Sequence, residues 1–355
     1  MSGPVVADLG EAGILARITP LLPFGRDVLV GPGDDCAVLA APDGRYCVST
    51  DVLVEGRHFR TDWSSGFDVG ARAAAQNLAD IAAMGARPVA LVACLVLPGA
   101  TPVDWVVDLA RGMALRCREA GAAIVGGDLS AGEGLVVAVT VHGDLEGRSP
   151  VLRSGARPGD LLVHTGTLGR SAAGLALLGA GIDDSGRNGA RGGASFRDGL
   201  EERTRAAAHE SLSVFRTPVP PLEEGPALSE AGATAMMDVS DGLLRDAGRM
   251  AGASRVRMDI DDPLGSVAGT GEDLAVLEPV ARLLEDSRAA ARALARRWVL
   301  TGGEDHGMLA AVPAETGPPP GSRVIGRVLE PDDGPRVMVS GRAPDAGKGW
   351  DHFRG

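Results

Sequence analysis

Aspartate residues recur in this chain at turns, at strand ends and on a helix face built of small residues. The helix face is the clearest case, because Ala73, Asn77, Asp80 and Met84 share it at three- and four-residue spacing. A face of small residues packs close to a neighbouring backbone, where a carboxylate is costly unless it is paired or coordinates a metal ion. Asp80 is therefore a candidate metal ligand, and a solvated Asp80 is the alternative that this helix leaves open.

A second group of oxygen-bearing side chains lies in residues 46–54, where Ser49, Thr50 and Asp51 are consecutive in an otherwise apolar run. The run predicts a strand that is buried on both faces, so polar residues in its middle call for a reason. Their side chains offer only oxygen ligands, the type that Mg²⁺ and Ca²⁺ prefer. A ladder of hydroxyl groups to neighbouring strands is the alternative.

Two further acids follow glycines. Asp35 comes after a Gly-Pro-Gly turn, and Asp128 follows Gly126-Gly127 at the end of a strand predicted over residues 122–125. Glycines at such points allow a close approach of the backbone to a partner. An acidic turn is usually just solvated, so each motif is weak by itself.

The sharpest signal in the second half of the chain is the DVSDGL motif of residues 238–243. A strand ends there and a helix begins, which brings Asp238, Ser240 and Asp241 to a helix N-terminus. The helix dipole at that point favours an anion such as phosphate. A plain N-cap role for Ser240 or Asp241 is the alternative.

The elements that must position these residues fall into two groups. The helix of Asp80 should begin near residues 67–68 and end before Gly85 and Pro88. Together with the strands and helices predicted around it, residues 1–147 should form an α/β domain. The elements predicted in this domain are helices over 11–22 and about 101–120 and strands over 46–54, 89–97, 122–125 and 135–141.

A polar connector over residues 148–159 marks the domain boundary, so the second domain should span 148–355. It opens with a strand over 160–165 and a helix over 168–178. Residues 179–199 are rich in Gly, Arg, Asp and Ser without periodicity, and are predicted to be a flexible insertion.

Composition excludes several classes of function. The net charge of −12 argues against a nucleic-acid surface, and no apolar run is long enough to span a membrane. Lys348 is the only lysine and lies outside any P-loop, so charge neutralisation at a phosphate must come from Arg and metal ions. The N-terminus lacks a signal peptide, and four cysteines without CxxC spacing suggest reduced core thiols in the cytoplasm.

Taken together, the motifs resemble the thiamine-monophosphate kinase family, which belongs to a superfamily with aminoimidazole ribonucleotide synthetase. The resemblance covers almost the whole chain, and eight motifs occur in the family's order. They are GDDCAVL (33–39), STDVLVEGRHF (49–59), NLADIAAMGARP (77–88), GGD (126–128), RSGARPGD (153–160), DVSDGL (238–243), GGED (302–305) and GWDHF (349–353).

The resemblance implies a two-domain fold of the aminoimidazole ribonucleotide synthetase type, α/β followed by α+β, that dimerises by pairing its N-terminal sheet. It implies ATP and several Mg²⁺ ions bound in a cleft between the domains, and phosphorylation of thiamine monophosphate to the diphosphate. A homodimer in the cytoplasm, with no nucleic-acid or membrane partner, is the expected form.

The family's functional residues carry over by motif. The positions that match its metal ligands are Asp35, Ser49, Thr50, Asp51, Asp80, Asp128, Asp238 and Asp241. Asp80, Asp128 and Asp238 are also the expected catalytic acids. The nucleotide-binding positions are Gly127, Asp128, Arg153 and Ser240, and those for thiamine phosphate are His58, Glu304 and Trp350.

The chain departs from the family at two motif positions, and an ATP-contacting position in the helix after Trp105 is not placed by the motifs, with Arg111 as one candidate. Ala79 replaces a serine off the Asp80 face, and His306-Gly307-Met308 replaces the usual residues after GGED. Two other functions stay open. A ring-forming synthetase of the same superfamily would share the acids without needing His58 or Trp350, and a non-catalytic metal-binding scaffold would need only some of the acids.

Overall fold

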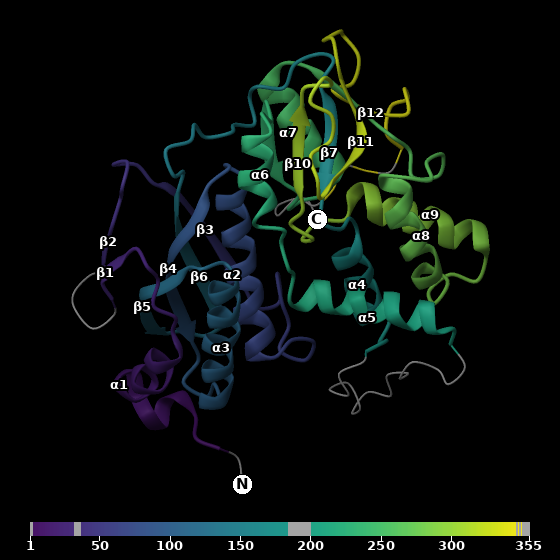
Figure 1. Cartoon of the computed structure of the whole chain (residues 1–355). Coiled ribbons are helices and arrows are strands. Elements are labelled where there is room, and N and C mark those ends of the chain that lie inside the picture. Colours follow the sequence, from purple (N-terminus) through teal and green to yellow (C-terminus); the bar gives the residue numbers. More distant parts are fainter. Residues whose placement is uncertain (1–2, 32–36, 184–199, 346, 348, 350–355) are drawn as a thin grey trace. The chain divides into compact units, whose positions relative to one another are not determined.

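The computed structural model describes residues 3–31, 37–183, 200–345, 347 and 349 (Figure 1). The chain divides into two compact units. The first comprises Met1–Ala82 and Ala86–Ser149, and the second comprises Ala83–Gly85 and Pro150–Gly355. Each unit has its own sheet. Within the described residues, no helix is long and apolar enough to cross a membrane.

The first unit is built on a four-stranded sheet. Its strands run in the order β3 (Cys47–Val54), β6 (Val136–Asp144), β4 (Arg87–Leu97) and β5 (Ala123–Ala131). Strands β4 and β5 are parallel and the other pairs are antiparallel. The long helix α2 (Gly66–Ala82) packs on this sheet and against α3 (Val103–Glu119), as Figure 1 shows. The smaller elements of this unit are α1 (Val6–Ile18), η1 (Thr19–Leu21), β1 (Val28–Val30) and β2 (Val38–Leu39).

The prediction that the 46–54 strand is buried on both faces is wrong. Strand β3 lies at the edge of the sheet, and Val48 and Val52 are 61% and 45% exposed, whereas Leu53 is 2% exposed. Because side chains alternate along a strand, residues 49, 51 and 53 lie on the face opposite to 48, 50 and 52. The apolar residues of β3 therefore include some, such as Val48 and Val52, on a face that is exposed rather than buried.

Two other expectations need correction. Gly126-Gly127-Asp128 lies inside β5, which pairs with β4 as far as Ala131, and not at a strand end. The helix expected over 11–22 is confirmed in outline, because α1 (Val6–Ile18) is interrupted at the non-helical Gly10, continues to Ile18 and is followed by η1 over Thr19–Leu21. The thiols are free in Cys47, Cys94 and Cys117, but Cys94 is exposed and so is not a core residue. Cys36 lies outside the described residues.

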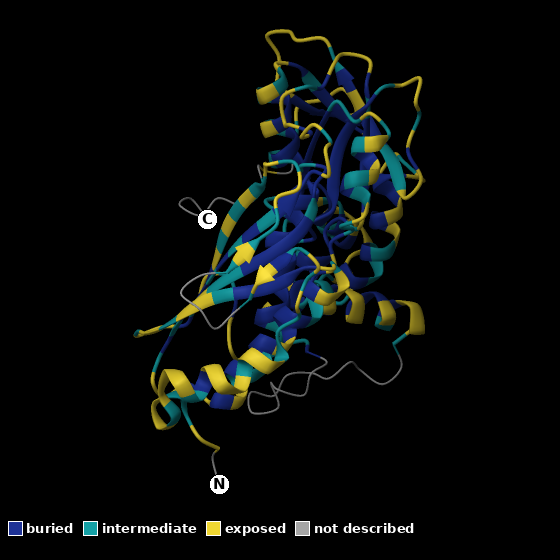
Figure 2. Ribbon diagram, turned by 60° about the vertical axis from the view of Figure 1, so that its left-hand side comes forward, coloured by how far each residue is buried: buried dark blue, intermediate teal, exposed yellow. Residues whose placement is uncertain are grey.

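The second unit is built on a six-stranded sheet. The strand order is β12 (Val337–Val339), β9 (Arg257–Ile260), β11 (Ser322–Leu329), β7 (Leu161–Thr165), β10 (Met308–Val312) and β8 (Ala235–Asp238). Only the pair β12 and β9 is parallel. Strands β8, β10 and β12 are buried along their whole length, and Figure 2 draws buried residues in dark blue. The helices of this unit are α4 (Arg170–Gly179), α5 (Glu202–Arg216), α6 (Glu224–Glu230), α7 (Leu243–Ser254), α8 (Thr270–Ala281) and α9 (Arg288–Thr301).

The predicted insertion over 179–199 lies between α4 and α5. Residues 184–199 are outside the described part of the chain, so the prediction of flexibility stays untested. Just before them, Asp183 forms a buried ion pair with Arg216 at the end of α5. This pair fixes the position at which the segment leaves the unit.

Candidate active site

In the first unit, the structure brings Asp80 and Ser49 together. The Ser49 hydroxyl donates a hydrogen bond of 2.6 Å to Oδ2 of Asp80. Helix α2 carries Asp80 to the face of β3 on which residues 49 and 51 lie, so Asp51 is on the same face. The two strongest acidic signals of this half of the sequence thus converge on one side of the sheet.

Thr50 lies on the other face of β3. Its hydroxyl donates to the Val139 carbonyl at 2.9 Å and accepts from the Thr140 hydroxyl at 3.2 Å. This arrangement is the hydroxyl ladder that the sequence left as the alternative for this strand. The role of Thr50 as a metal ligand therefore remains a prediction, and its hydroxyl is engaged within the sheet.

His58 follows β3 in a tight loop. The Val54 amide donates to Nδ1 of His58 at 2.9 Å. Because Nδ1 accepts this hydrogen bond, a neutral imidazole must carry its own hydrogen on Nε2. His58 thus presents an N–H donor on its outer nitrogen, which suits an anionic ligand. Beyond it, the Arg60 guanidinium lies 4.3 Å from the centre of the Trp63 ring.

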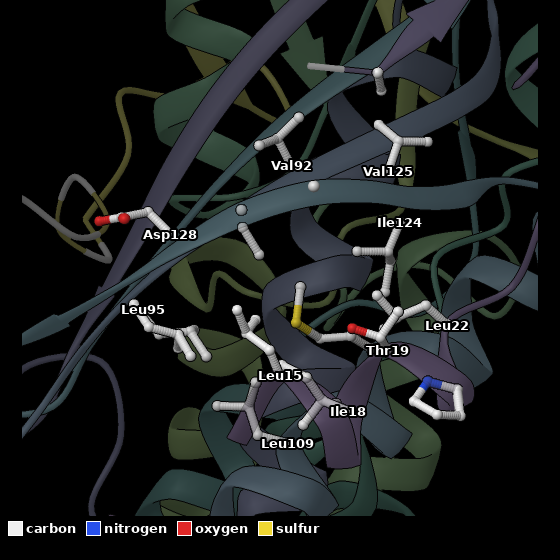
Figure 3. A pocket seen from close by; sticks show the side chains of 18 of the residues that line it. Leu15, Ile18, Thr19, Leu22, Val92, Leu95, Leu109, Ile124, Val125 and Asp128 are labelled. Carbon is white, nitrogen blue, oxygen red and sulfur yellow. The ribbon is translucent and has the colours of Figure 1, made fainter. Parts of the chain in front are cut away.

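Asp128 and Gly127 lie at the edge of an apolar pocket of about 890 Å³ within the first unit (Figure 3). Its walls come from α1, η1, β2, β4, α3, β5 and β6, and Figure 3 shows the Asp128 carboxylate directed away from the aliphatic side chains. The aliphatic side chains labelled there are Leu15, Ile18, Leu22, Val92, Leu95, Leu109, Ile124 and Val125. Asp128 also accepts a hydrogen bond from Ser130 at 3.2 Å.

The pocket was not foreseen from the sequence, because its walls come from seven elements far apart in the chain. Helix α3 contributes Leu109, Ala110 and Met113 to the lining. Arg111 instead forms a surface ion pair with Asp108 at 3.0 Å. The apolar spacing of α3 would have identified the face of Met113, but not what lies opposite it.

In the second unit, the DVSDG and GGED motifs form one structure. The pairing of β8 with β10 continues past the strands, since Glu304 N donates to Ser240 O at 2.9 Å and Val239 N donates to Gly307 O at 2.8 Å. At position 303 a Cβ atom would overlap the Ser240 carbonyl, so only glycine fits there. The ladder therefore brings Asp238, Ser240 and Glu304 together.

Asp241 is held by a charged network at the start of α7. Its Oδ2 accepts from Arg249 at 2.5 Å, and its backbone amide donates to Asp246 at 2.9 Å. Asp246 in turn accepts from Arg249 at 2.7 Å, and burial raises the pKa of the Asp246 carboxyl to about 6. Asp246 could not be singled out from the sequence, because an acid in the first turn of a helix is common.

Asp305 fastens the GGED loop to the start of α4. Its carboxylate accepts from the Ser171 amide at 2.8 Å, the Arg170 amide at 2.9 Å and the Thr167 hydroxyl at 2.8 Å. Burial raises the pKa of Asp305, and these hydrogen bonds act in the opposite direction. Glu304 stands in the left-handed region, with φ of 70°, beside this clamp.

The Arg153 loop is held by Ser254 at the end of α7. The Ser254 hydroxyl donates to the Arg153 carbonyl at 2.9 Å and accepts from the amides of Gly155 and Ala156 at 3.0 and 3.1 Å. The Arg153 side chain is exposed. The backbone of this loop is thus fixed while its guanidinium faces solvent.

Asp35 and Trp350 lie outside the described residues, so their predicted roles stay predictions. Among the residues that are described, no group of three or more His, Cys, Asp or Glu side chains is arranged to hold a metal ion. The predicted ligands instead occur as hydrogen-bonded pairs and small networks within each unit. Their donor atoms are all oxygens, which fits Mg²⁺.

Comparison with known proteins supports one family throughout. Residues 33–145 match the N-terminal domain, and residues 157–317 the C-terminal domain, of AIR synthase related proteins. The thiamine-monophosphate kinase of Mycobacterium tuberculosis is 44% identical over 355 residues, which is 99% of this chain and 93% of the relative. That of Corynebacterium glutamicum is 40% identical over 99% of this chain and 96% of its own length.

Solved structures agree with the sequence relatives. The thiamine-monophosphate kinase of Stenotrophomonas maltophilia K279a superposes with a TM-score of 0.71 at 29% identity, covering 93% of this chain and 95% of that one. A structure described as AaThiL complexed with AMPPCP and TMP gives a TM-score of 0.70 at 27% identity, covering 98% of both chains. The chain therefore belongs to the thiamine-monophosphate kinase family.

Proposed function

We propose that this protein transfers the terminal phosphoryl group of ATP to thiamine monophosphate, forming thiamine diphosphate and ADP. The observation that carries the proposal is the 44% identity to a thiamine-monophosphate kinase over 99% of the chain. The relative solved with AMPPCP, an analogue of ATP, and TMP supports the same pair of substrates.

We place the adenine of ATP in the apolar pocket of the first unit. A volume of about 890 Å³ is ample for a purine base, and aliphatic walls suit its flat faces. Asp128, at the edge of the pocket, would then lie beside the phosphates, where a bound cation must separate it from them. Arg153, whose guanidinium faces solvent, is the proposed cationic contact to the nucleotide.

The residues that would hold Mg²⁺ are the predicted ligands Asp35, Ser49, Thr50, Asp51, Asp80, Asp128, Asp238 and Asp241. When bound, Mg²⁺ supplies neutralisation of the phosphate charges, which a chain of net charge −12 with one lysine does not otherwise provide. Ser49 holds one Asp80 oxygen by its 2.6 Å hydrogen bond, which fixes the orientation of the carboxylate.

The acceptor substrate needs orientation more than activation. A phosphomonoester is already ionised near neutral pH, so a direct in-line displacement requires positioning and charge neutralisation but no strong base. The Nε2–H of His58 suits the acceptor phosphate, and the Glu304 carboxylate suits the cationic thiazolium. Trp350 is the proposed aromatic partner of that cation. Gly349, just before it, lies against the Asp241 carbonyl, so the tail reaches the DVSDG motif.

The function is tested by incubating the purified protein with ATP, thiamine monophosphate and Mg²⁺ and separating the products. We expect thiamine diphosphate and ADP in equal amounts, and no product when EDTA exceeds the metal. Aminoimidazole precursors offered in place of thiamine monophosphate should give no ring closure. Ring closure without thiamine diphosphate, or full activity in EDTA, would instead favour one of the rival functions.

We further propose that the protein is a homodimer that covers the open face and edge of β3. Val48 and Val52 are exposed there, and an uncovered apolar edge strand invites pairing with a second copy. Sedimentation at micromolar concentration should give twice the chain mass of 36.2 kDa. Val52→Lys should shift this toward the monomer. Val219→Lys, at an equally apolar residue that is 67% exposed in the second unit, should leave the mass unchanged. A monomeric wild-type protein would contradict the proposal.

A further inference from the structure

His306 occupies a fixed place between two carboxylates of the second unit. Its backbone amide donates to the Val239 carbonyl at 3.3 Å, which ties the residue to the DVSDG motif. The side chain is 5% exposed, and its Nδ1 lies 3.1 Å from Oδ2 of Asp238, whose side chain is 4% exposed. On the other side of the ring, Nε2 lies 3.9 Å from Oε2 of Glu304.

The contact with Asp238 has a defined direction. An ionised carboxylate only accepts hydrogen bonds, so Nδ1 must carry the hydrogen and donate it to Asp238. One carboxylate oxygen is thereby held inside the unit, and the other is left for a ligand. A donor that fixes a metal-binding carboxylate in this way typically changes metal affinity by about 10- to 100-fold.

We propose that His306 is a positioning residue, which orients Asp238 for Mg²⁺ through the hydrogen bond between Nδ1 and that carboxylate. The inference rests on the proposed function, because that function assigns Asp238 to the metal. His306 itself touches neither substrate. A purely structural role, in which the imidazole only fills space, is the alternative to be tested.

The backbone conformation at residue 306 guides the choice of substitutions that test this role. His306 has φ of 56°, in the left-handed region that asparagine tolerates better than most residues. In His306→Asn the side-chain amide can take the place of Nδ1–H. In His306→Gln the amide reaches toward the Nε2 position instead, and His306→Leu has no donor. His164, in β7 of the same unit, is a fully buried imidazole, so His164→Leu controls for the loss of a buried ring.

The measurement is Mg²⁺ binding by calorimetry in the presence of AMPPCP, with kcat, KM and the melting temperature of each variant. His306→Leu and His306→Gln should raise the Kd for Mg²⁺ by about 10- to 100-fold and should lower kcat at subsaturating Mg²⁺. His306→Asn should stay within about threefold of wild type in Kd, as a retained donor predicts. His164→Leu should change the melting temperature but not the Kd. The ¹⁵N spectrum of the wild-type protein should show the hydrogen of His306 on Nδ1.

The proposal is overturned if His306→Leu and His306→Gln bind Mg²⁺ as tightly as wild type, or if His306→Asn is as weak as His306→Leu. Should His306→Leu not fold, His306→Gln decides, because it keeps a polar side chain of similar size. A wild-type protein that binds Mg²⁺ but does not phosphorylate thiamine monophosphate would defeat the proposed function alone. The Kd values of the wild-type protein and of the three His306 variants would still decide the role of His306.

Discussion

Asp80→Asn should lower kcat by roughly 10²- to 10³-fold, the usual effect of removing one group that stabilises charge in a transition state. The fold should persist, because the asparagine carbonyl can still accept the Ser49 hydroxyl that now lies 2.6 Å from Asp80. The melting temperature should therefore stay close to that of wild type. Steady-state assays across a range of Mg²⁺ concentrations measure the effect.

Asp68→Asn is the matched control, since it makes the same exchange at the other end of α2. Asp68 accepts from the Ser65 amide at 2.7 Å and caps the helix. Its replacement keeps an oxygen that can accept from Ser65 but removes the negative charge near the helix N-terminus, so it should lower the free energy of unfolding by at most about 1 kcal/mol, with kcat unchanged. If Asp80→Asn turned over like Asp68→Asn, Asp80 would be a solvated or purely structural acid.

Asp305→Asn should lower the free energy of unfolding of the second unit by about 3 kcal/mol, because it breaks a buried charged cluster. The asparagine Nδ2 would meet the Arg170 amide, which now donates to Oδ2 at 2.9 Å, so two donors would face each other. A loosened loop should also misplace Glu304 and raise the KM for thiamine monophosphate more than that for ATP. Chemical denaturation and steady-state kinetics measure the two effects.

Asp333→Asn, at an exposed acid of the same unit, serves as the control and should change stability by less than about 0.5 kcal/mol. An Asp305→Asn protein that unfolds at the wild-type denaturant concentration would show that the carboxylate does not clamp the loop. If stability falls but neither KM changes, the Asp305 hydrogen bonds stabilise the loop without positioning Glu304.

Elements with strong local signals were predictable from the sequence. The helix of Asp80 begins at Gly66 and ends at Ala82, close to its predicted bounds, and Gly85 has the positive φ of 73° that its end requires. The strand predicted over 89–97 is β4, Arg87–Leu97. Local periodicity and capping decide such elements, so the sequence contains the information.

Features that depend on distant partners were not predictable. The exposure of Val48 and Val52 follows from the edge position of β3, which a single apolar run does not encode. The continuation of β5 through Gly126 to Ala131 depends on pairing with β4, which overrides the weak strand preference of glycine.

The same distinction, between local sequence signals and tertiary contacts, applies to the residues of the candidate site. Asp80, Asp238 and Glu304 stand out in sequence because acids and glycines are unusual in apolar surroundings. The residues that hold the acids, such as Asp246 and His306, do not stand out, since their partners are set by tertiary contacts across β8, β10 and α7. Motifs therefore identify the acids that are proposed to meet ligands, and only the structure identifies the groups that hold those acids.

The place of β10 in the second sheet has a consequence for how the chain folds. Every strand of the first sheet ends by Asp144, so that sheet can close while the rest is still being synthesised. In the second sheet, β10 lies between β7 and β8 although it follows both by a long stretch of chain. Until Met308–Val312 leaves the ribosome, β7 and β8 expose unpaired edges. Folding of this unit should consequently be slow and chaperone-dependent, and truncation before β10 should yield aggregates rather than a smaller folded protein.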